Sequence, residues 1–208
     1  MAIIFNADDL QLAAQSAIKT WKGSEGALAQ ELQATSIISD DFLRRWLGVW
    51  MLARSNPKTY RTELASFLSE QAKPRITAAS EAQLPTLVCE LSVEMLQAQA
   101  TRSRQTSLMS KFAFSLRPEV IVPYDRRARL GLGDMFGQRL QDHDYPAYLL
   151  AFNAFAAEVA QALNRQQITQ RMRTDWEPVM PKRLFEMRTA DKYFMLLGGF
   201  SKERMARD

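Results

Sequence analysis

Cysteine and histidine are almost absent from this sequence, which contains one of each among 208 residues. Cys89 alone forms no intrachain disulfide and no thiolate site for zinc or an iron–sulfur cluster. His143 alone excludes a metal centre built from several histidines. The side chains left for chemistry are those of lysine, arginine, the carboxylates, serine and tyrosine, and we expect no metal and no cofactor.

Glycine and proline are also scarce, at eight residues each, which disfavours a turn-rich all-β architecture. No run approaches the roughly 18 apolar residues that a membrane-spanning helix needs. The first five residues are apolar, but Asn6, Asp8 and Asp9 interrupt them, so we expect no signal peptide. Together with the unpaired cysteine, these absences predict a cytoplasmic protein.

What the sequence does contain is helical periodicity, which predicts an all-α fold of seven to nine helices. One apolar stripe, typical of a core-facing helix, contains Phe42, Trp46, Leu47, Trp50 and Met51. Apolar residues make up 47% of the chain and charged residues 24%, which is ordinary for a globular protein. We expect a single domain over residues 1–208, with two helical lobes, 1–100 and 101–208, as the open alternative.

Helix ends are marked by polar residues and glycines. The residues predicted to cap helix N-termini are Asp8 or Asp9, Ser39, Asn56, Asp125 and Asp144. Residues 22–26 are expected to end the first helix, and Gly198-Gly199 the last. Residues 118–124, β-branched and flanked by prolines, predict an extended connector or one isolated strand.

Positive charge is concentrated in one segment. Residues 101–130 have a net charge of +5, whereas residues 1–100 carry −2 and residues 131–208 carry +1. The basic residues of the segment are Arg102, Arg104, Lys111, Arg117, Arg126, Arg127 and Arg129. Such a patch predicts DNA or another polyanion as partner. The alternative is that these side chains lie on solvated helix faces and pair with acidic residues.

The same segment carries a pattern of residues that bears on catalysis. Lys111 lies on a predicted helix and is followed by Pro118, an apolar connector, Pro123 and Asp125, which begins a new helix. This pattern resembles the segment of helix-hairpin-helix DNA glycosylases that carries a catalytic Lys and Asp. It is most similar to small bacterial proteins with an 8-oxoguanine DNA glycosylase fold. Residues 188–198 are similar to the closing helix of such chains.

The resemblance implies a compact glycosylase-like domain and base excision from DNA. Lys111 would be the amine nucleophile that attacks the sugar and forms a Schiff base, and Asp125 the carboxylate that handles charge or protons. Arg126, Arg127 and Arg129 would contact phosphates, and Arg102, Arg104 and Arg117 complete the expected nucleic-acid-binding set.

Other interpretations remain open at this point. Lys111 is also explained as an exposed helical lysine, and Asp125 as a helix cap without a catalytic role. The chain is then a non-catalytic nucleic-acid-binding or protein-interaction module, or a dimer whose arginines pair with acids across the interface. Whether it is an enzyme stays open. Cys89 is expected to be a buried inert thiol and His143 an exposed loop residue, while Trp21 and Trp176 are weaker candidates for lining a pocket.

Overall fold

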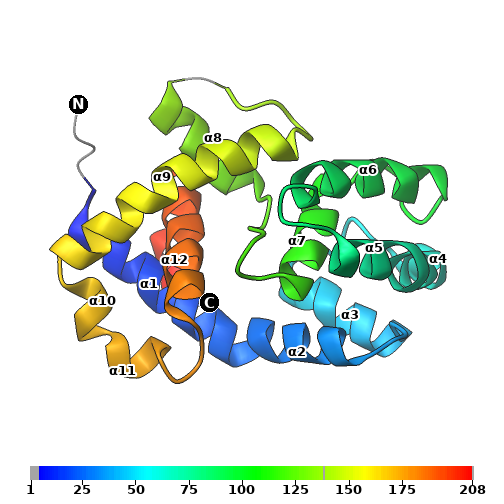
Figure 1. Ribbon diagram of the computed structural model, residues 1–208, viewed down its shortest axis with the longest axis horizontal. Coiled ribbons are helices and arrows are strands. Elements are labelled where there is room, and N and C mark those ends of the chain that lie inside the picture. The colour runs from blue at the N-terminus through cyan, green and yellow to red at the C-terminus, as the bar shows by residue number, and fades with distance from the viewer. Residues whose placement is uncertain (1–4, 138, 208) are drawn as a thin grey trace. The chain divides into compact units, whose positions relative to one another are not determined.

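The computed structural model describes residues 5–137 and 139–207, without the side chain of Phe136. Residues 1–4, which belong to the apolar start of the chain, lie outside that description. The described residues contain helices, turns and irregular segments but no strand, which confirms the all-α prediction (Figure 1). Eight of the described helices have nine or more residues, as expected. Among these residues, no helix is long and apolar enough to cross a membrane.

The chain divides into two compact units. Unit 1 comprises Met1–Gly23, Tyr124–Asp142 and Ala147–Asp208, and unit 2 comprises Ser24–Pro123 and His143–Pro146. Unit 1 contains α1 (Ala7–Thr20), α8 (Arg126–Phe136), α10 (Ile168–Arg171), α11 (Arg173–Trp176), α12 (Lys182–Leu197), α13 (Lys202–Arg207) and most of α9 (Tyr145–Arg165). The expectation of one domain stays a prediction.

Unit 2 is built around α7 (Thr106–Leu116), in which every residue except Ser107 is buried. The helices of unit 2 that precede it in the sequence are α2 (Gly26–Ala34), α3 (Asp40–Val49), α4 (Arg61–Phe67), α5 (Lys73–Ala78) and α6 (Leu84–Gln97). Figure 1 shows α7, in green, packed against α2, α5 and α6. Trp46 of α3 meets Phe112 edge to face at 6.0 Å and donates a hydrogen bond to Ser115 Oγ at 3.1 Å. Burial of α7 therefore depends on four neighbouring helices.

Unit 1 is built around α12, which packs against α1 and α8 (Figure 1). The approach of α8 to the end of α12 depends on two glycines. A Cβ on Gly131 would lie 2.2 Å from the carbonyl oxygen of Phe194, and one on Gly198 would lie 1.8 Å from that of Arg127. Any side chain at either position would push the two helices apart, because the atoms it meets belong to the backbone.

Several predicted helix ends are confirmed, because capping depends on nearby residues. Ser39 Oγ accepts a hydrogen bond from Phe42 N at 3.1 Å, and Asp125 Oδ1 accepts one from Arg127 N at 2.8 Å. Gly199 ends α12 with φ at +82°. Residues 118–124 form a connector that has no strand.

Other predicted ends are wrong. The first helix is capped by Asn6, whose Oδ1 accepts from Asp9 N at 3.0 Å, so Asp8 and Asp9 lie inside its first turn. It does not end at residues 22–26, because a π-helical turn over Trp21–Glu25 leads directly into α2. Glycine is only mildly unfavourable within a helix, so Gly23 does not stop it. Asn56 caps no helix, because its amide pairs with the side chain of Gln105.

One member of the predicted core stripe is exposed. Phe42, Trp46, Leu47 and Trp50 are buried as expected, but Met51 is 55% exposed. The periodicity breaks there because α3 ends at Val49, and Met51 already has a left-handed backbone with φ at 54°. A helical pattern predicts burial only as far as the helix extends.

The close contact at the glycines predicts a strong asymmetry between two Gly→Ala substitutions. We expect Gly131→Ala to destabilise the protein by about 1–3 kcal/mol or more, since the added methyl meets backbone atoms. Gly48→Ala is the matched control, because a Cβ there meets nothing within 4 Å in α3, and it should stabilise by about 0.5–1 kcal/mol. Urea unfolding measures both values, and equal effects would contradict the packing described.

Candidate functional site

Lys111 lies in the middle of α7 and is 6% exposed. Its Nζ donates a hydrogen bond to the carbonyl oxygen of Trp50 at 3.3 Å and lies 5.7 Å from the centroid of the Trp50 ring. The interpretation of Lys111 as an exposed helical lysine is therefore wrong. An amine inside a helical core is costly to bury, because desolvation disfavours its charged form.

A polar network surrounds the start of α7. Thr106 Oγ1 lies 3.0 Å from His143 Nδ1 and 3.3 Å from Ser92 Oγ. Arg104 donates to Ser92 Oγ at 3.1 Å and to the carbonyl oxygen of His143 at 3.3 Å. Cys89 Sγ also donates to that carbonyl, at 3.3 Å. Arg104 and His143 thus have structural contacts in unit 2, and His143 is only partly exposed, whereas an exposed loop residue was expected.

Asp125 stands at the N-terminus of α8 in unit 1, where its carboxylate caps the helix through Arg127 N. The next residue, Arg126, is exposed, and its guanidinium has no hydrogen bond or ion pair with another described residue. The Arg127 guanidinium donates to the carbonyl oxygen of Gly199 and lies 5.7 Å from the centroid of the Phe200 ring. Arg127 therefore connects the start of α8 to the end of α12.

The remaining predicted arginines divide into structural and exposed groups. Arg129 is 6% exposed, donates to the carbonyl oxygen of Leu140 and forms an ion pair with Asp142. Arg117 donates to the carbonyl oxygen of Ala79 at 3.2 Å. Arg102 is exposed and, like Arg126, its guanidinium makes no polar contact with any other residue in the described ranges. Arg102 and Arg126 are thus the two members of the set best placed to meet an outside anion.

The second segment of the resemblance forms part of the core of unit 1. Arg188 and Asp191 are one turn apart on α12, both 2% exposed in their side chains, and form an ion pair. Sequence reasoning pointed to these residues but not to their burial. Trp176 is buried and stacks on Phe185 at 5.2 Å with 13° between the ring planes. It also lines a pocket of about 390 Å³ together with Thr169 and Arg173, as its sequence interpretation allowed.

Another partly buried amine in unit 2, Lys73, has a structural explanation. Its Nζ donates to the carbonyl oxygens of Leu32 and Thr35 at the end of α2, where helix carbonyls lack partners. Burial lowers the pKa of Lys73. Of the described His, Cys, Asp and Glu residues, no group of three or more is arranged to hold a metal ion.

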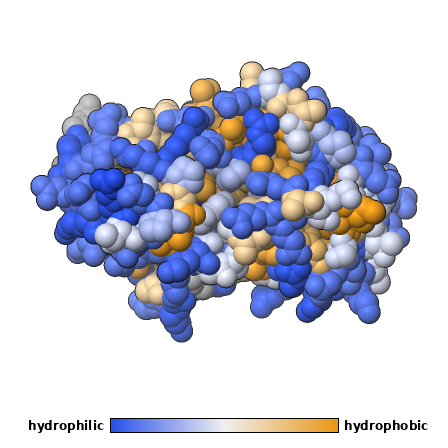
Figure 2. Space-filling model, turned by 60° about the horizontal axis from the view of Figure 1, so that its bottom comes forward, coloured by the Kyte–Doolittle hydropathy of each residue, from blue (hydrophilic) through white to orange (hydrophobic). Residues whose placement is uncertain are grey.

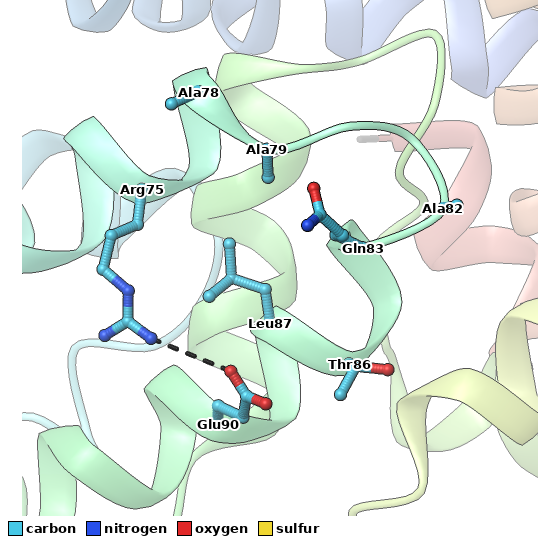
Figure 3. A pocket seen from close by; sticks show the side chains of 8 residues that line it. All are labelled: Arg75, Ala78, Ala79, Ala82, Gln83, Thr86, Leu87 and Glu90. Atoms are coloured by element: carbon cyan, nitrogen blue, oxygen red, sulfur yellow. Dashed lines mark ion pairs between the residues drawn. The ribbon is translucent and has the colours of Figure 1, made fainter.

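A shallow pocket of about 590 Å³ lies between α5 and α6. Figure 3 shows Arg75 of α5 pointing toward Glu90 of α6, with Leu87 and three alanines supplying apolar lining. Arg75 pairs with Glu90 at 3.7 Å and with Glu94 at 2.5 Å. Its positive charge is compensated, and none of the predicted site residues lines the pocket, so we do not assign the site there.

The exposed surface offers few apolar groups. The face in Figure 2 is mostly hydrophilic, with apolar side chains in small scattered groups. The exposed large apolar residues in the described ranges are Ile37, Met51, Leu96, Leu130, Leu150 and Leu197. A scan against protein-family models, a search of curated proteins and a search of solved structures each found no match to this chain.

The different surroundings of Arg126 and Arg129 predict different effects on stability. We expect Arg129→Ala to cost about 1–3 kcal/mol, because it removes charge-assisted hydrogen bonds from a buried guanidinium. Arg126→Ala should stay within about 0.5 kcal/mol of the wild type, as exposed substitutions usually do. Chemical unfolding checks this pair of values, and a reversed order would refute the division into structural and exposed arginines.

The burial of its amine predicts that Lys111 contributes little to the free energy of unfolding. Lys111→Met retains the length and much of the volume of the side chain and removes the cost of burying an amine. We expect a free energy of unfolding equal to that of the wild type within about 1 kcal/mol, or higher. A loss above about 3 kcal/mol, measured in urea, would identify the residue as a structural element instead.

Proposed function

We propose that this chain binds DNA and excises a base, with the Lys111 amine as nucleophile. The observation that supports this most is the burial of an amine in the middle of the central helix of unit 2, held at Trp50. Placement in a desolvated pocket is one way in which proteins activate a lysine as a nucleophile. The residue is also the one that the glycosylase resemblance assigns to this task.

The proposed chemistry needs no cofactor. The Nζ lone pair bonds to the sugar C1′ as the glycosidic bond breaks, and the base leaves with the bonding electrons. The proton lost by the amine goes to the departing base. The nitrogen then forms a double bond to C1′, the ring oxygen O4′ leaves C1′, and the remaining amine proton goes to O4′. The product is a Schiff base between Lys111 and the opened sugar, with every atom accounted for.

Asp125 is the proposed carrier of these protons, an assignment that rests on the sequence resemblance alone. A carboxylate suits the task because it accepts a proton from the amine and returns it to a leaving group. The exposed Arg102 and Arg126 are proposed to contact phosphates, since neither guanidinium has an intramolecular partner among the described residues. The target nucleotide must leave the base stack for the amine to reach C1′.

A non-catalytic nucleic-acid-binding module is the second candidate, favoured by the exposed arginines if Lys111 makes no bond. It predicts salt-sensitive binding of DNA without any covalent product. A third interpretation, in which the exposed arginines pair with acids of a second copy, predicts a dimer by light scattering and no DNA shift at low salt.

Borohydride trapping tests the enzymatic proposal. The wild type is incubated with duplexes that carry an abasic site or a damaged base, and borohydride reduces any Schiff base to a stable amine. We expect a covalent protein–DNA product from the wild type and none from Lys111→Met. Lys182→Met is the control, because it removes an exposed amine of unit 1 and should leave trapping unchanged.

Asp125→Asn refines the same experiment. Asparagine caps helices as well as aspartate does, so α8 should begin unaltered and the melting temperature should hold. Loss of proton transfer should slow formation of the adduct at least about tenfold. Adduct formation at the wild-type rate would remove Asp125 from the mechanism, and binding without any adduct across the lesions tested would leave only the non-catalytic module.

A further inference from the structure

Two stretches of unit 2 contain no acidic residue. Residues 42–62 carry five basic and no acidic side chains, and residues 95–118 carry four and none. Unit 2 as a whole has 11 basic and 11 acidic residues, so it is neutral overall. Its positive charge is therefore separated from its negative charge along the chain.

The fold joins these two stretches through their loops. Gln105 donates to Asn56 Oδ1 at 3.0 Å and to the carbonyl oxygen of Ser55 at 3.2 Å, and Asn56 returns a hydrogen bond to Gln105 Oε1 at 3.1 Å. Lys111 adds a contact to Trp50, at the base of the first loop. We call residues 51–58 and 99–105 together the loop pair.

The exposed cations of the loop pair lack intramolecular partners, unlike most others in unit 2. Arg54, Lys58 and Arg102 are exposed, and none of their side chains has a hydrogen bond or ion pair with another residue that the structure describes. By contrast, Arg44 and Arg45 pair with Asp41 at 2.7 and 3.1 Å, although they belong to the same acid-free stretch as Arg54. Unpaired charge is thus concentrated in the loops beside Lys111.

Met51 adds an apolar group at an unfavourable backbone position. Leu52 N donates to Leu47 O at 2.8 Å and Met51 N to Gly48 O at 3.0 Å, which is the Schellman arrangement at a helix C-terminus. Glycine is preferred at the left-handed residue of this motif, and Gly199 occupies the same place after α12. Met51 instead combines a left-handed φ of 54° with a side chain that is 55% exposed. A backbone strained in this way commonly marks a functional position.

We propose that the loop pair is a DNA-binding surface in which Arg54, Lys58 and Arg102 contact phosphates and Met51 packs against an exposed base face. This inference rests on the proposed function, which requires a base to leave the stack. Apolar side chains such as methionine enter base steps that have been unstacked, and they gain by covering base faces that would otherwise meet water. Arg54, Lys58 and Met51 were not among the residues that the sequence pattern singled out as a site.

The partner that fits these groups is a DNA duplex in which one base has left the stack. The three cations provide affinity that falls with salt, because each phosphate contact releases condensed counterions. They carry no preference for sequence. The apolar contact of Met51 distinguishes a duplex that lacks a stacked base from an intact duplex, because only a gap in the stack exposes the faces of the neighbouring bases.

Fluorescence anisotropy with a duplex that carries a tetrahydrofuran abasic analogue tests the surface without any reaction, because this analogue forms no Schiff base. We expect the double variant Arg54→Ala/Lys58→Ala to reduce the slope of log affinity against log salt by about 1.8. Arg44→Ala/Arg45→Ala is the matched control and should leave the slope unchanged, because its arginines are already paired.

Met51→Gly separates a functional methionine from a structural one. Glycine adopts the left-handed conformation without steric cost, so the melting temperature should stay the same or rise. Affinity for the abasic duplex should fall about fivefold or more, with little change for an intact duplex. Gln167→Gly repeats the backbone change at another left-handed residue, in unit 1, and should leave both affinities unchanged.

The outcomes distinguish this inference from the proposed function. If the wild type binds and is trapped on DNA but the Arg54/Lys58 variant keeps the full salt slope, the loop pair is not the binding surface and the proposed function stands. If the wild type binds no DNA, the proposed function falls as well. If the variant instead loses binding to vesicles of anionic lipid and retains binding to DNA, the surface serves a membrane and the proposal is overturned.

Discussion

A helix covered by neighbours on every side must be filled with groups that do not need water. α7 is buried at every residue except Ser107, and its Phe112 packs edge to face against Trp46 of α3. Of its four buried polar residues, Thr106, Ser110 and Ser115 carry hydroxyl groups, whereas Lys111 places an amine inside the unit against the end of α3. The structure around it depends on this constraint, because the amine must find an acceptor, and the Trp50 carbonyl supplies one where α3 ends.

The placement of Lys111 also explains why the turn after α3 bears on function. The turn that exposes the Trp50 carbonyl to the amine is the turn that presents Met51 in a left-handed conformation. Gln105 then ties the loop after Met51 to the segment that leads into α7. The Lys111 amine, the Met51 side chain and the exposed cations of the loop pair thus belong to one connected part of unit 2.

Local signals predicted the fold class and the caps at Ser39 and Asp125, because a cap is decided by residues three or fewer positions away. They failed where the outcome depends on distant partners. The helical pattern correctly placed Phe112 inward, but it left Lys111 open to solvent because one sequence cannot show that helices cover the opposite face. Residues 22–26 were wrongly predicted to stop the first helix, because Gly23 does not reveal that a π-helical turn continues into α2.

Charge counting located part of the candidate site and misjudged the roles within it. The basic segment 101–130 contains arginines used for structure, such as Arg104 and Arg129, and exposed ones, such as Arg102. Their difference lies in partners from elsewhere in the chain, which a segment total does not reveal. Segment charges also gave no sign of Arg54 and Lys58, because the acidic residues among positions 1–100 outnumber the basic ones and make the net charge of that segment negative.

The most direct test of the account is to locate the covalent bond itself. Protein reduced with borohydride in the presence of abasic DNA is digested, and mass spectrometry identifies the modified residue. The account predicts the sugar remnant on Nζ of Lys111 and on no other lysine. A remnant on an exposed lysine such as Lys58, or unmodified protein after exhaustive reduction, would contradict it.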